Sequence, residues 1–274
     1  MVSFPPAKIN LGLNVVRRRS DGYHDIRTIM YPIPIHDVLE VIADGSLDEG
    51  KVTYTRSGIA IPGDPSKDLC VLAIEEFRKF FPLPGLKVHL HKVIPIGAGL
   101  GGGSSDGAHM LSMLSRLFWK ELEKELPEMA SLLGSDCPFF LRPKAQLAEG
   151  RGELLTELNV PHLVGKWMML VNPGIHVPTA AVYSAMRPTG RSVVLMEIIT
   201  LPIDQWQGRL VNDMEEYVLS QYASIGSVKQ QLLKAGAIYA SMSGSGSSVF
   251  GIFDHEPASI QWPEDHLIHV FQLP

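Results

Sequence analysis

Apolar and polar positions alternate along several short stretches of this chain, and this period of two is typical of β-strands. The first stretch, residues 7–16, alternates apolar side chains with small or polar ones and ends in a turn at Arg17–Gly22. A later strand follows a Gly/Ser-rich loop at Ser241–Ser248. The predicted strands are residues 7–16, 26–35, 38–43, 51–54, 86–94, 139–141, 167–171 and 249–253.

Other stretches repeat apolar residues at the 3.6-residue spacing of an α-helix. The clearest repeat follows a glycine-rich segment and predicts a helix that continues to Trp119. Pro127 stands where a first helical turn would begin and predicts a short helix to Leu133. Alternating helices and strands predict α+β or α/β layers in two lobes, which we divide into residues 1–160 and 161–274. The remaining predicted helices are residues 69–80, 179–187 and 212–235.

The composition indicates a folded protein with a large buried core. Of the 274 residues, 45% are hydrophobic and 19% are charged, which excludes intrinsic disorder. The net charge is −5 and no run of Lys and Arg is longer than Arg17–Arg19, so we expect no nucleic-acid partner.

Three further features of the sequence indicate the cellular compartment of the protein. No apolar stretch approaches the roughly 18 residues of a membrane span, and Pro5-Pro6 stand where the apolar core of a secretory signal would lie. Two cysteines, Cys70 and Cys137, cannot build a disulfide framework or a cysteine-rich zinc site. We therefore expect a cytoplasmic protein with no membrane partner.

The most informative segment is the glycine-rich stretch PIGAGLGGGSSDG at residues 95–107. Glycines allow a positive φ and let backbone N–H groups approach a ligand. In front of a helix, these groups and the helix dipole together form an anion site. Ser104 and Ser105 could cap the helix and donate their hydroxyls to phosphate oxygens. Because so many glycines carry a large entropy cost, we expect phosphate binding here and not a turn without a ligand.

Three known motifs resemble parts of this segment. The pattern G-x-G-x-x-G at 97–102 fits a dinucleotide fingerprint, but a helix follows where that motif needs a second strand with an acidic residue. A Walker loop needs a lysine, and none precedes Ser104. The pattern G-x-S-x-G at 103–107 fits a nucleophile elbow, but no downstream histidine stands in a supporting motif.

A lysine and an aspartate, far apart in the sequence, could supply chemistry beside a bound phosphate donor. Lys8 and Asn10 lie on the same face of the first strand, with apolar residues around Lys8. Asp136 comes directly before Cys-Pro-Phe-Phe, in apolar surroundings. A buried carboxylate could accept the proton of an alcohol while a lysine stabilises negative charge on oxygen. Taken singly, Lys8 could be a surface lysine and Asp136 a helix cap or turn residue.

Together, these motifs resemble the GHMP kinase superfamily. The resemblance implies an α+β fold of two lobes, an N-terminal lobe similar to domain 2 of ribosomal protein S5 and a ferredoxin-like C-terminal lobe, with the active site in the cleft. The matching segments, in the family's order, are PAKINLGL (6–13), RSDGYHDIRT (19–28), PIGAGLGGGSSDGA (95–108), GSDCPFFL (134–141), GRGELL (150–155), NPGIHVPTAAVY (172–183) and SMSGSGSSVFGIF (241–253).

Within the superfamily, the resemblance is to kinases of the non-mevalonate isoprenoid pathway that act on a cytidine diphosphate methylerythritol. It implies phosphoryl transfer from ATP, bound as Mg-ATP, to the 2-hydroxyl of this small-molecule substrate by a monomer or homodimer. Asp136 would be the general base, and Lys8 would orient and polarise the hydroxyl. We assign no metal-ligating residue, because the sequence shows no acidic cluster of the kind that holds a metal ion.

The resemblance also implies binding residues. Asn10 would bind the erythritol phosphate part, the Tyr23 ring would stack on the cytosine, His24 would bond to the base edge, and Tyr183 would cover the other face. The implied ATP-binding residues are Pro95, Ile96, Gly97, Ala98, Gly99, Leu100, Gly101, Gly102, Gly103, Ser104 and Ser105.

Two alternative functions stay open. Another GHMP kinase could act on mevalonate, homoserine or a sugar, although Tyr23, His24 and Tyr183 favour a substrate that carries cytidine. A nucleotide-binding regulator without catalysis could retain the glycine loop, although Lys8 and Asp136 argue against it. Taken alone, Tyr23 and His24 could be an ordinary pair of residues after a turn.

Overall fold

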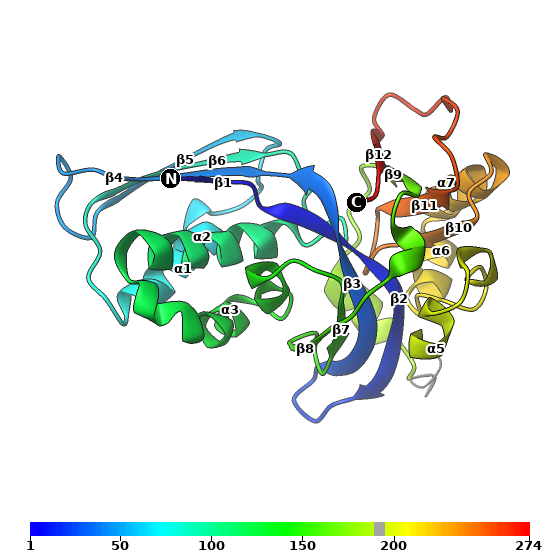
Figure 1. Cartoon of the computed structure of the whole chain (residues 1–274), viewed down its shortest axis with the longest axis horizontal. Coiled ribbons are helices and arrows are strands. Elements are labelled where there is room, and N and C mark those ends of the chain that lie inside the picture. Colours follow the sequence, from blue (N-terminus) through cyan, green and yellow to red (C-terminus); the bar gives the residue numbers. More distant parts are fainter. Residues whose placement is uncertain (189–194) are drawn as a thin grey trace. The chain divides into compact units, whose positions relative to one another are not determined.

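The computed structural model describes residues 1–188 and 195–274 and contains the mixture of helices and strands that the sequence predicts. The chain forms two compact units, each assembled from several segments (Figure 1). Among the described residues, no helix is long and apolar enough to cross a membrane. Unit 1 consists of Met1–Ala7, Ile35–Ile96 and Gly101–Pro143, and unit 2 of Lys8–Pro34, Gly97–Leu100 and Lys144–Pro274.

Unit 1 is a sheet with helices on one face (Figure 1). The strand order is β1 (Val2–Ser3), β4 (Val38–Ala43), β6 (Leu86–Lys92) and β5 (Val52–Gly58), with β5 parallel to β6 and the other neighbours antiparallel. The period-two pattern of β6 buries Leu86, Val88 and Leu90. The helices are α1 (Leu69–Arg78), α2 (Gly102–Phe118) and α3 (Leu126–Leu133).

Unit 2 contains two four-stranded sheets. The first has the order β2 (Pro6–Arg18), β3 (His24–His36), β7 (Gln146–Glu149) and β8 (Leu154–Glu157). The second has the order β10 (Tyr239–Met242), β11 (Val249–Phe253), β9 (Trp167–Asn172) and β12 (Leu267–Gln272), and all its neighbours are antiparallel.

Helices cover the second sheet of unit 2 and bury its apolar side chains. Met169 and Val171 of β9 belong to one buried cluster with Val218, Ile225 and Val228 of the helices. The described helices of this unit are α4 (Thr179–Ala185), α5 (Leu195–Ile199), α6 (Glu215–Gln221) and α7 (Ala223–Lys234).

The compact units differ from the predicted division into residues 1–160 and 161–274. That division follows chain order, whereas β2 and β3 pair in one sheet with β7 and β8. Residues 8–34 and 144–160 therefore pack with the C-terminal part of the chain. Pairing of strands that are distant in sequence leaves no mark in the local composition.

Most predicted elements are confirmed within a few residues, and one predicted strand is wrong. Residues 139–141 belong to a 3₁₀ helix, Cys137–Leu141, in which Pro138 occupies the first turn. Phe139 and Phe140 are both buried and form an edge-to-face pair with ring centroids 4.9 Å apart. A short apolar run looks alike in a buried strand and a buried helical turn, so the sequence pattern could not separate them.

The sequence predicts a single helix over residues 212–235. This prediction is also wrong, because the segment forms two helices, α6 and α7. Asn212 and Asp213 precede α6, and Tyr222 separates α6 from α7 with φ −129° and ψ 77°. The apolar residues of both helices face the same buried cluster, so their combined spacing resembles one helix. Strands β1, β7, β8 and β10 were not predicted, because two to four residues are too few to show a period. Strand β12 has six residues, as many as β4, and was also missed.

Candidate active site

The glycine-rich loop alternates glycines of positive φ with buried apolar side chains. Gly97, Gly99 and Gly101 have φ values of +63°, +79° and +69°, a region that glycine alone enters freely. Between them, Ala98 and Leu100 are buried. The apolar side chains anchor the loop, and the glycines provide the backbone turns.

Gly99 packs directly against the second Gly/Ser loop, residues 243–248. A Cβ on Gly99 would lie 1.9 Å from the carbonyl oxygen of Ser243. The Ser243 hydroxyl donates to the Gly99 oxygen at 2.8 Å, and the Ser248 amide donates to the Ala98 oxygen at 3.2 Å. The two loops, which the sequence shows as separate motifs, are therefore one assembly within unit 2.

This contact predicts that Gly99→Ala destabilises the protein more than an ordinary glycine replacement. Both the positive φ and the contact with the Ser243 oxygen oppose a Cβ, and the φ strain alone costs about 1–3 kcal/mol. Gly208 is the matched control, since its φ is +78° and a Cβ there would meet nothing within 4 Å. Urea unfolding of both variants measures the difference, and equal losses would contradict the close contact.

Two buried asparagines hold the Gly/Ser loop in place. Asn212 Nδ2 donates to the Met242 oxygen at 2.9 Å and to the Gly244 oxygen at 2.8 Å. Asn172 Nδ2 donates to the Ser248 hydroxyl at 3.0 Å. Sequence reasoning missed both residues, because their role depends on contacts with a segment distant in the chain.

The N-terminus of α2 differs from the predicted cap. Helix α2 begins at Gly102, and its N-cap is Gly101, so Ser104 and Ser105 stand inside the first turns instead of capping them. The first helical bond, from the Ser105 amide to the Gly101 oxygen, leaves the amides of residues 102–104 without an acceptor in the helix. The Ser105 side chain is fully buried, and its hydroxyl has no hydrogen-bond partner among the described residues.

A buried cluster of charges lies beside this first turn. Lys92 Nζ pairs with Asp37 and, at 2.7 Å, with Asp106 of α2. A Cβ on Gly102 would lie 3.1 Å from Lys92 Nζ. Burial raises the pKa of Asp106 well above its ordinary value, and the charge of Lys92 opposes that increase.

The first strand confirms that Lys8 and Asn10 share a face. Lys8 Nζ donates to Asn10 Oδ1 at 2.6 Å, and both residues are buried, so Lys8 is not a surface lysine. Asn10 Nδ2 donates to the Thr28 hydroxyl at 3.0 Å. The Lys8 amide donates to the Leu100 oxygen at 2.9 Å, and the Asn10 amide donates to the Ser243 hydroxyl at 3.2 Å. The pair is thus bonded to both glycine-rich loops.

Asp136 belongs to unit 1, where it follows α3 and precedes the 3₁₀ helix Cys137–Leu141. Its side chain makes no capping bond to that helix, unlike the cap considered from the sequence. Burial raises the pKa of the adjacent Cys137 thiol to about 12, so this neighbour stays neutral. Lys8 belongs to unit 2, and the approach of the two side chains stays a prediction.

The residues predicted to recognise a nucleobase form part of unit 2. The rings of His24 and Tyr183 are stacked, with centroids 5.5 Å apart and planes at 23°. His24 is buried, whereas the Tyr23 side chain on the preceding turn is 55% exposed. Burial, and then the charge of Arg18, lower the pKa of His24. A neutral imidazole has one donor and one acceptor for the edge of a base.

Known sequence families and proteins match most of this chain. Sequence models described as GHMP kinases N terminal domain and GHMP kinases C terminal match residues 68–143 and 203–261. A protein from Cytophaga hutchinsonii named 4-diphosphocytidyl-2-C-methyl-D-erythritol kinase is 43% identical over 258 residues, 94% of each chain. A protein of the same name from Azobacteroides pseudotrichonymphae is 46% identical over 256 residues, 92% of this chain and 93% of its own.

Solved structures confirm the predicted fold. A crystal structure of 4-(cytidine 5'-diphospho)-2C-methyl-D-erythritol kinase matches with a TM-score of 0.77 and 32% identity over 92% of this chain and 90% of that one. A mevalonate kinase structure has a TM-score of 0.69 at 13% identity, over 92% and 91% of the two chains, and shares the fold alone. On the identity and coverage of these relatives, the chain belongs to the 4-diphosphocytidyl-2-C-methyl-D-erythritol kinase family of GHMP kinases.

Proposed function

We propose that this chain transfers the γ-phosphoryl group of ATP to the 2-hydroxyl of 4-diphosphocytidyl-2-C-methyl-D-erythritol, giving the 2-phosphate and ADP. The observation that carries the proposal is the buried pair of Lys8 and Asn10, which is bonded to both glycine-rich loops. An ammonium and an amide beside a loop of accessible backbone amides are the groups that phosphoryl transfer requires.

The glycine loop has the form of a phosphate cradle. A side chain at Gly99 would collide with Ser243, and the amides that begin α2 have no helical acceptor. These features support binding of the ATP phosphates along residues 97–105, with the positive end of the α2 dipole nearby. The Ser105 hydroxyl is buried and its amide is bonded to the Gly101 oxygen, so at this end of the loop the amides of residues 102–104 would make the phosphate contacts.

Magnesium would enter this site as part of the nucleotide substrate, where it neutralises charge on the phosphates. Within residues 1–188 and 195–274, no group of three or more His, Cys, Asp and Glu side chains could hold a metal ion. What the chain itself supplies is the backbone amides and the ammonium of Lys8.

The acceptor of the proposed reaction is a tertiary alcohol, which is hindered and a poor nucleophile. Alignment and charge neutralisation should supply most of the acceleration. In the proposal, Asp136 accepts the hydroxyl proton while Lys8 stabilises the negative charge on oxygen. Asn10 accepts a bond from Lys8 Nζ at its Oδ1, which orients the ammonium.

Recognition of the cytidine part would use the turn and helix residues of unit 2. Tyr23 offers an exposed ring for stacking, and His24 is held by its contact with the Tyr183 ring. For Tyr183 to cover the second face of the base, as the resemblance implies, the base would have to displace or extend this stack. The proposal accordingly ranks Tyr23 as the main stacking partner.

Tyr23→Ala tests this assignment. We expect KM for the cytidyl substrate to rise by about 5- to 150-fold, because stacking on an aromatic side chain contributes about 1–3 kcal/mol per base. KM for ATP should not change, since Tyr23 serves the other substrate. Steady-state kinetics with each substrate varied in turn measures both constants, and an unchanged KM for the cytidyl substrate would exclude the stacking role.

An assay across acceptor alcohols tests the function as a whole. The purified protein, supplied with Mg-ATP, is given the cytidyl substrate, mevalonate, homoserine and a sugar in parallel. We expect ADP release with the cytidyl substrate alone. Turnover of another alcohol in its place would favour a different GHMP kinase, and ATP binding without turnover of any would favour a regulator.

A further inference from the structure

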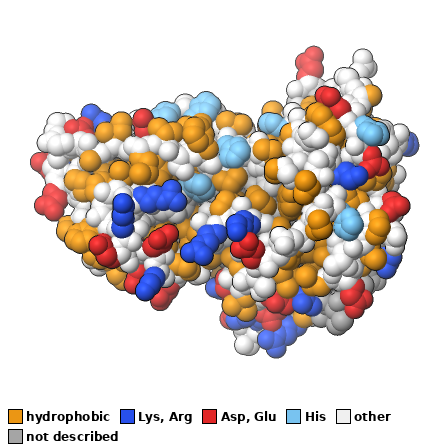
Figure 2. Space-filling model, viewed as in Figure 1, with side chains coloured by type: hydrophobic (Ala, Val, Ile, Leu, Met, Phe, Trp, Pro, Cys, Tyr) orange, Lys and Arg blue, Asp and Glu red, His pale blue; other side chains and the backbone are white. Residues whose placement is uncertain are grey.

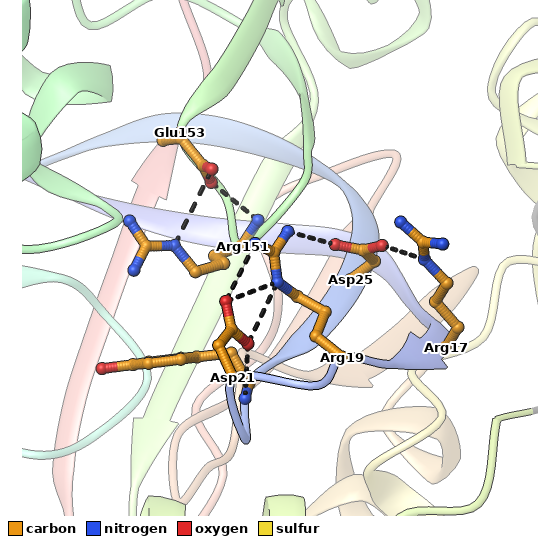
Figure 3. Close-up of polar contacts among 7 residues, drawn as sticks. Arg17, Arg19, Asp21, Asp25, Arg151 and Glu153 are labelled. Carbon is orange, nitrogen blue, oxygen red and sulfur yellow. Dashed lines mark hydrogen bonds and ion pairs between the residues drawn. The ribbon is translucent and has the colours of Figure 1, made fainter.

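The turn that carries Tyr23 is closed by a network of arginines and aspartates (Figure 3). Arg19 Nε donates to Asp21 at 3.0 Å, and Arg19 Nη1 donates to Asp25 at 2.9 Å. Arg17 pairs with the same Asp25. The Tyr23 amide donates to Asp21 Oδ1 at 3.1 Å, so the network reaches the backbone from which the Tyr23 ring emerges.

A second turn, which connects β7 to β8, places Arg151 beside this network (Figure 3). The Ile26 amide donates to the Gly150 oxygen at 2.7 Å, which joins this turn to the start of β3. Glu153 Oε2 accepts a bond from the Arg151 amide at 2.6 Å, and Glu153 Oε1 lies 3.8 Å from Arg151 Nε. Backbone and side chain of Arg151 are thus both held by Glu153.

The guanidinium of Arg151 lies over the Tyr23 ring. Its Cζ is 5.1 Å from the ring centroid, within the distance at which a cation is attracted to an aromatic face. The Tyr23 side chain is nevertheless 55% exposed, so much of the ring stays open. Figure 2 shows basic and acidic side chains intermixed around the β2–β3 hairpin. With its charge balanced by Glu153, Arg151 covers one side of the ring.

We propose that Arg151 is a positioning residue for the nucleobase of the acceptor substrate and acts through Tyr23. The proposal rests on the proposed function, in which Tyr23 stacks on cytosine. By covering one face, Arg151 fixes the orientation of an otherwise exposed ring and leaves the opposite face for the base. A ring that is already ordered loses less conformational freedom when the substrate binds, so affinity increases without a direct contact.

The first experiment separates substrate binding from turnover. Arg151→Gln keeps much of the side-chain length and removes the charge, and we expect KM for the cytidyl substrate to rise about two- to fivefold. The values of kcat and of KM for ATP should stay unchanged. Arg151→Lys should recover part of the loss, because an ammonium is also attracted to an aromatic face. Lys144→Gln, which breaks an exposed ion pair with Glu157 across the same two strands, is the matched control.

A double-variant cycle then shows whether Arg151 acts through the ring. In a Tyr23→Ala background, the Arg151→Gln effect should disappear, because the ring that it orders is gone. A rise of the same size in that background would mean that Arg151 acts by another route and would overturn the proposal. Thermal unfolding of each variant checks that the hairpin remains folded.

The two proposals fail in different ways. If Tyr23→Ala raises KM and Arg151→Gln does not, the positioning role of Arg151 is wrong and the cytosine site stands. If Tyr23→Ala leaves KM unchanged, recognition of the base by Tyr23 is wrong, and the role of Arg151 falls with it.

Discussion

Asp136→Asn is expected to lower kcat by about 10²–10⁴-fold, the usual contribution of a general base. An amide of the same shape cannot accept the hydroxyl proton, so the tertiary alcohol would attack without assistance. KM for ATP should change little, because the proposed phosphate contacts lie in the glycine loop and not at Asp136. Initial rates with saturating substrates measure kcat, and nucleotide titration measures binding to the variant.

Two controls make this result specific to the carboxylate. Ser135→Ala alters the neighbouring residue of the same loop and should leave kcat within a few-fold of the original. Thermal unfolding of the asparagine variant checks that a loss of turnover is not a loss of the folded state. Turnover of Asp136→Asn near the original rate would exclude the general base role.

Lys92→Met should give the largest loss of stability. The side chain is 3% exposed and pairs with Asp37 and Asp106, which are 0% and 1% exposed. Removing the ammonium leaves two buried carboxylates without their cation, and breaking a buried pair in this way costs about 3–5 kcal/mol. Urea unfolding at pH 7 measures the loss. Lys166→Met, which removes a more exposed pair with Asp254, should cost less than about 1 kcal/mol.

The loss of stability in Lys92→Met should also depend on pH, and it should become larger as the pH rises. Burial already raises the pKa of Asp106, and without Lys92 nothing opposes that increase. A carboxyl whose folded pKa lies above its unfolded value favours the folded state below the unfolded pKa, and that advantage disappears as the pH rises. The destabilisation by Lys92→Met should therefore be smaller at pH 4 than at pH 8. A loss that is the same at both values would contradict a purely electrostatic cause.

The sequence predicts those features of the candidate site that depend on one continuous segment of the chain. The glycine loop of residues 95–107 predicts an anion site through the properties of glycine alone, and the alternation of residues 7–16 places Lys8 and Asn10 on one face. The structure confirms that shared face with a 2.6 Å bond. By contrast, Ser104 and Ser105 were assigned to the helix cap, because the sequence does not show that α2 starts as early as Gly102.

Contacts between distant segments had no signature that a single sequence could provide. Asn212 donates to backbone oxygens that lie 30 and 32 positions later in the chain. Arg151 lies over the ring of Tyr23, which is 128 positions earlier. The ion cluster joins Lys92 of β6 and Asp106 of α2 to Asp37, the residue between β3 and β4. Asp106 and Arg151 stand in motifs that the sequence shows, but no motif shows which distant side chains they contact, so only the packing assigns these roles.

The sequence by itself determined most of the strands and helices and which kinase family the motifs resemble, and it predicts an anion site at the glycine loop, because each of these depends on residues that are contiguous in the chain. Only the tertiary structure decided that the two glycine-rich loops pack through Gly99 and Ser243, that Lys92 is buried between two carboxylates, and that Arg151 covers Tyr23. The physical reason is that local backbone preference is encoded residue by residue, whereas close packing and charge pairing depend on which surfaces the folded chain brings together.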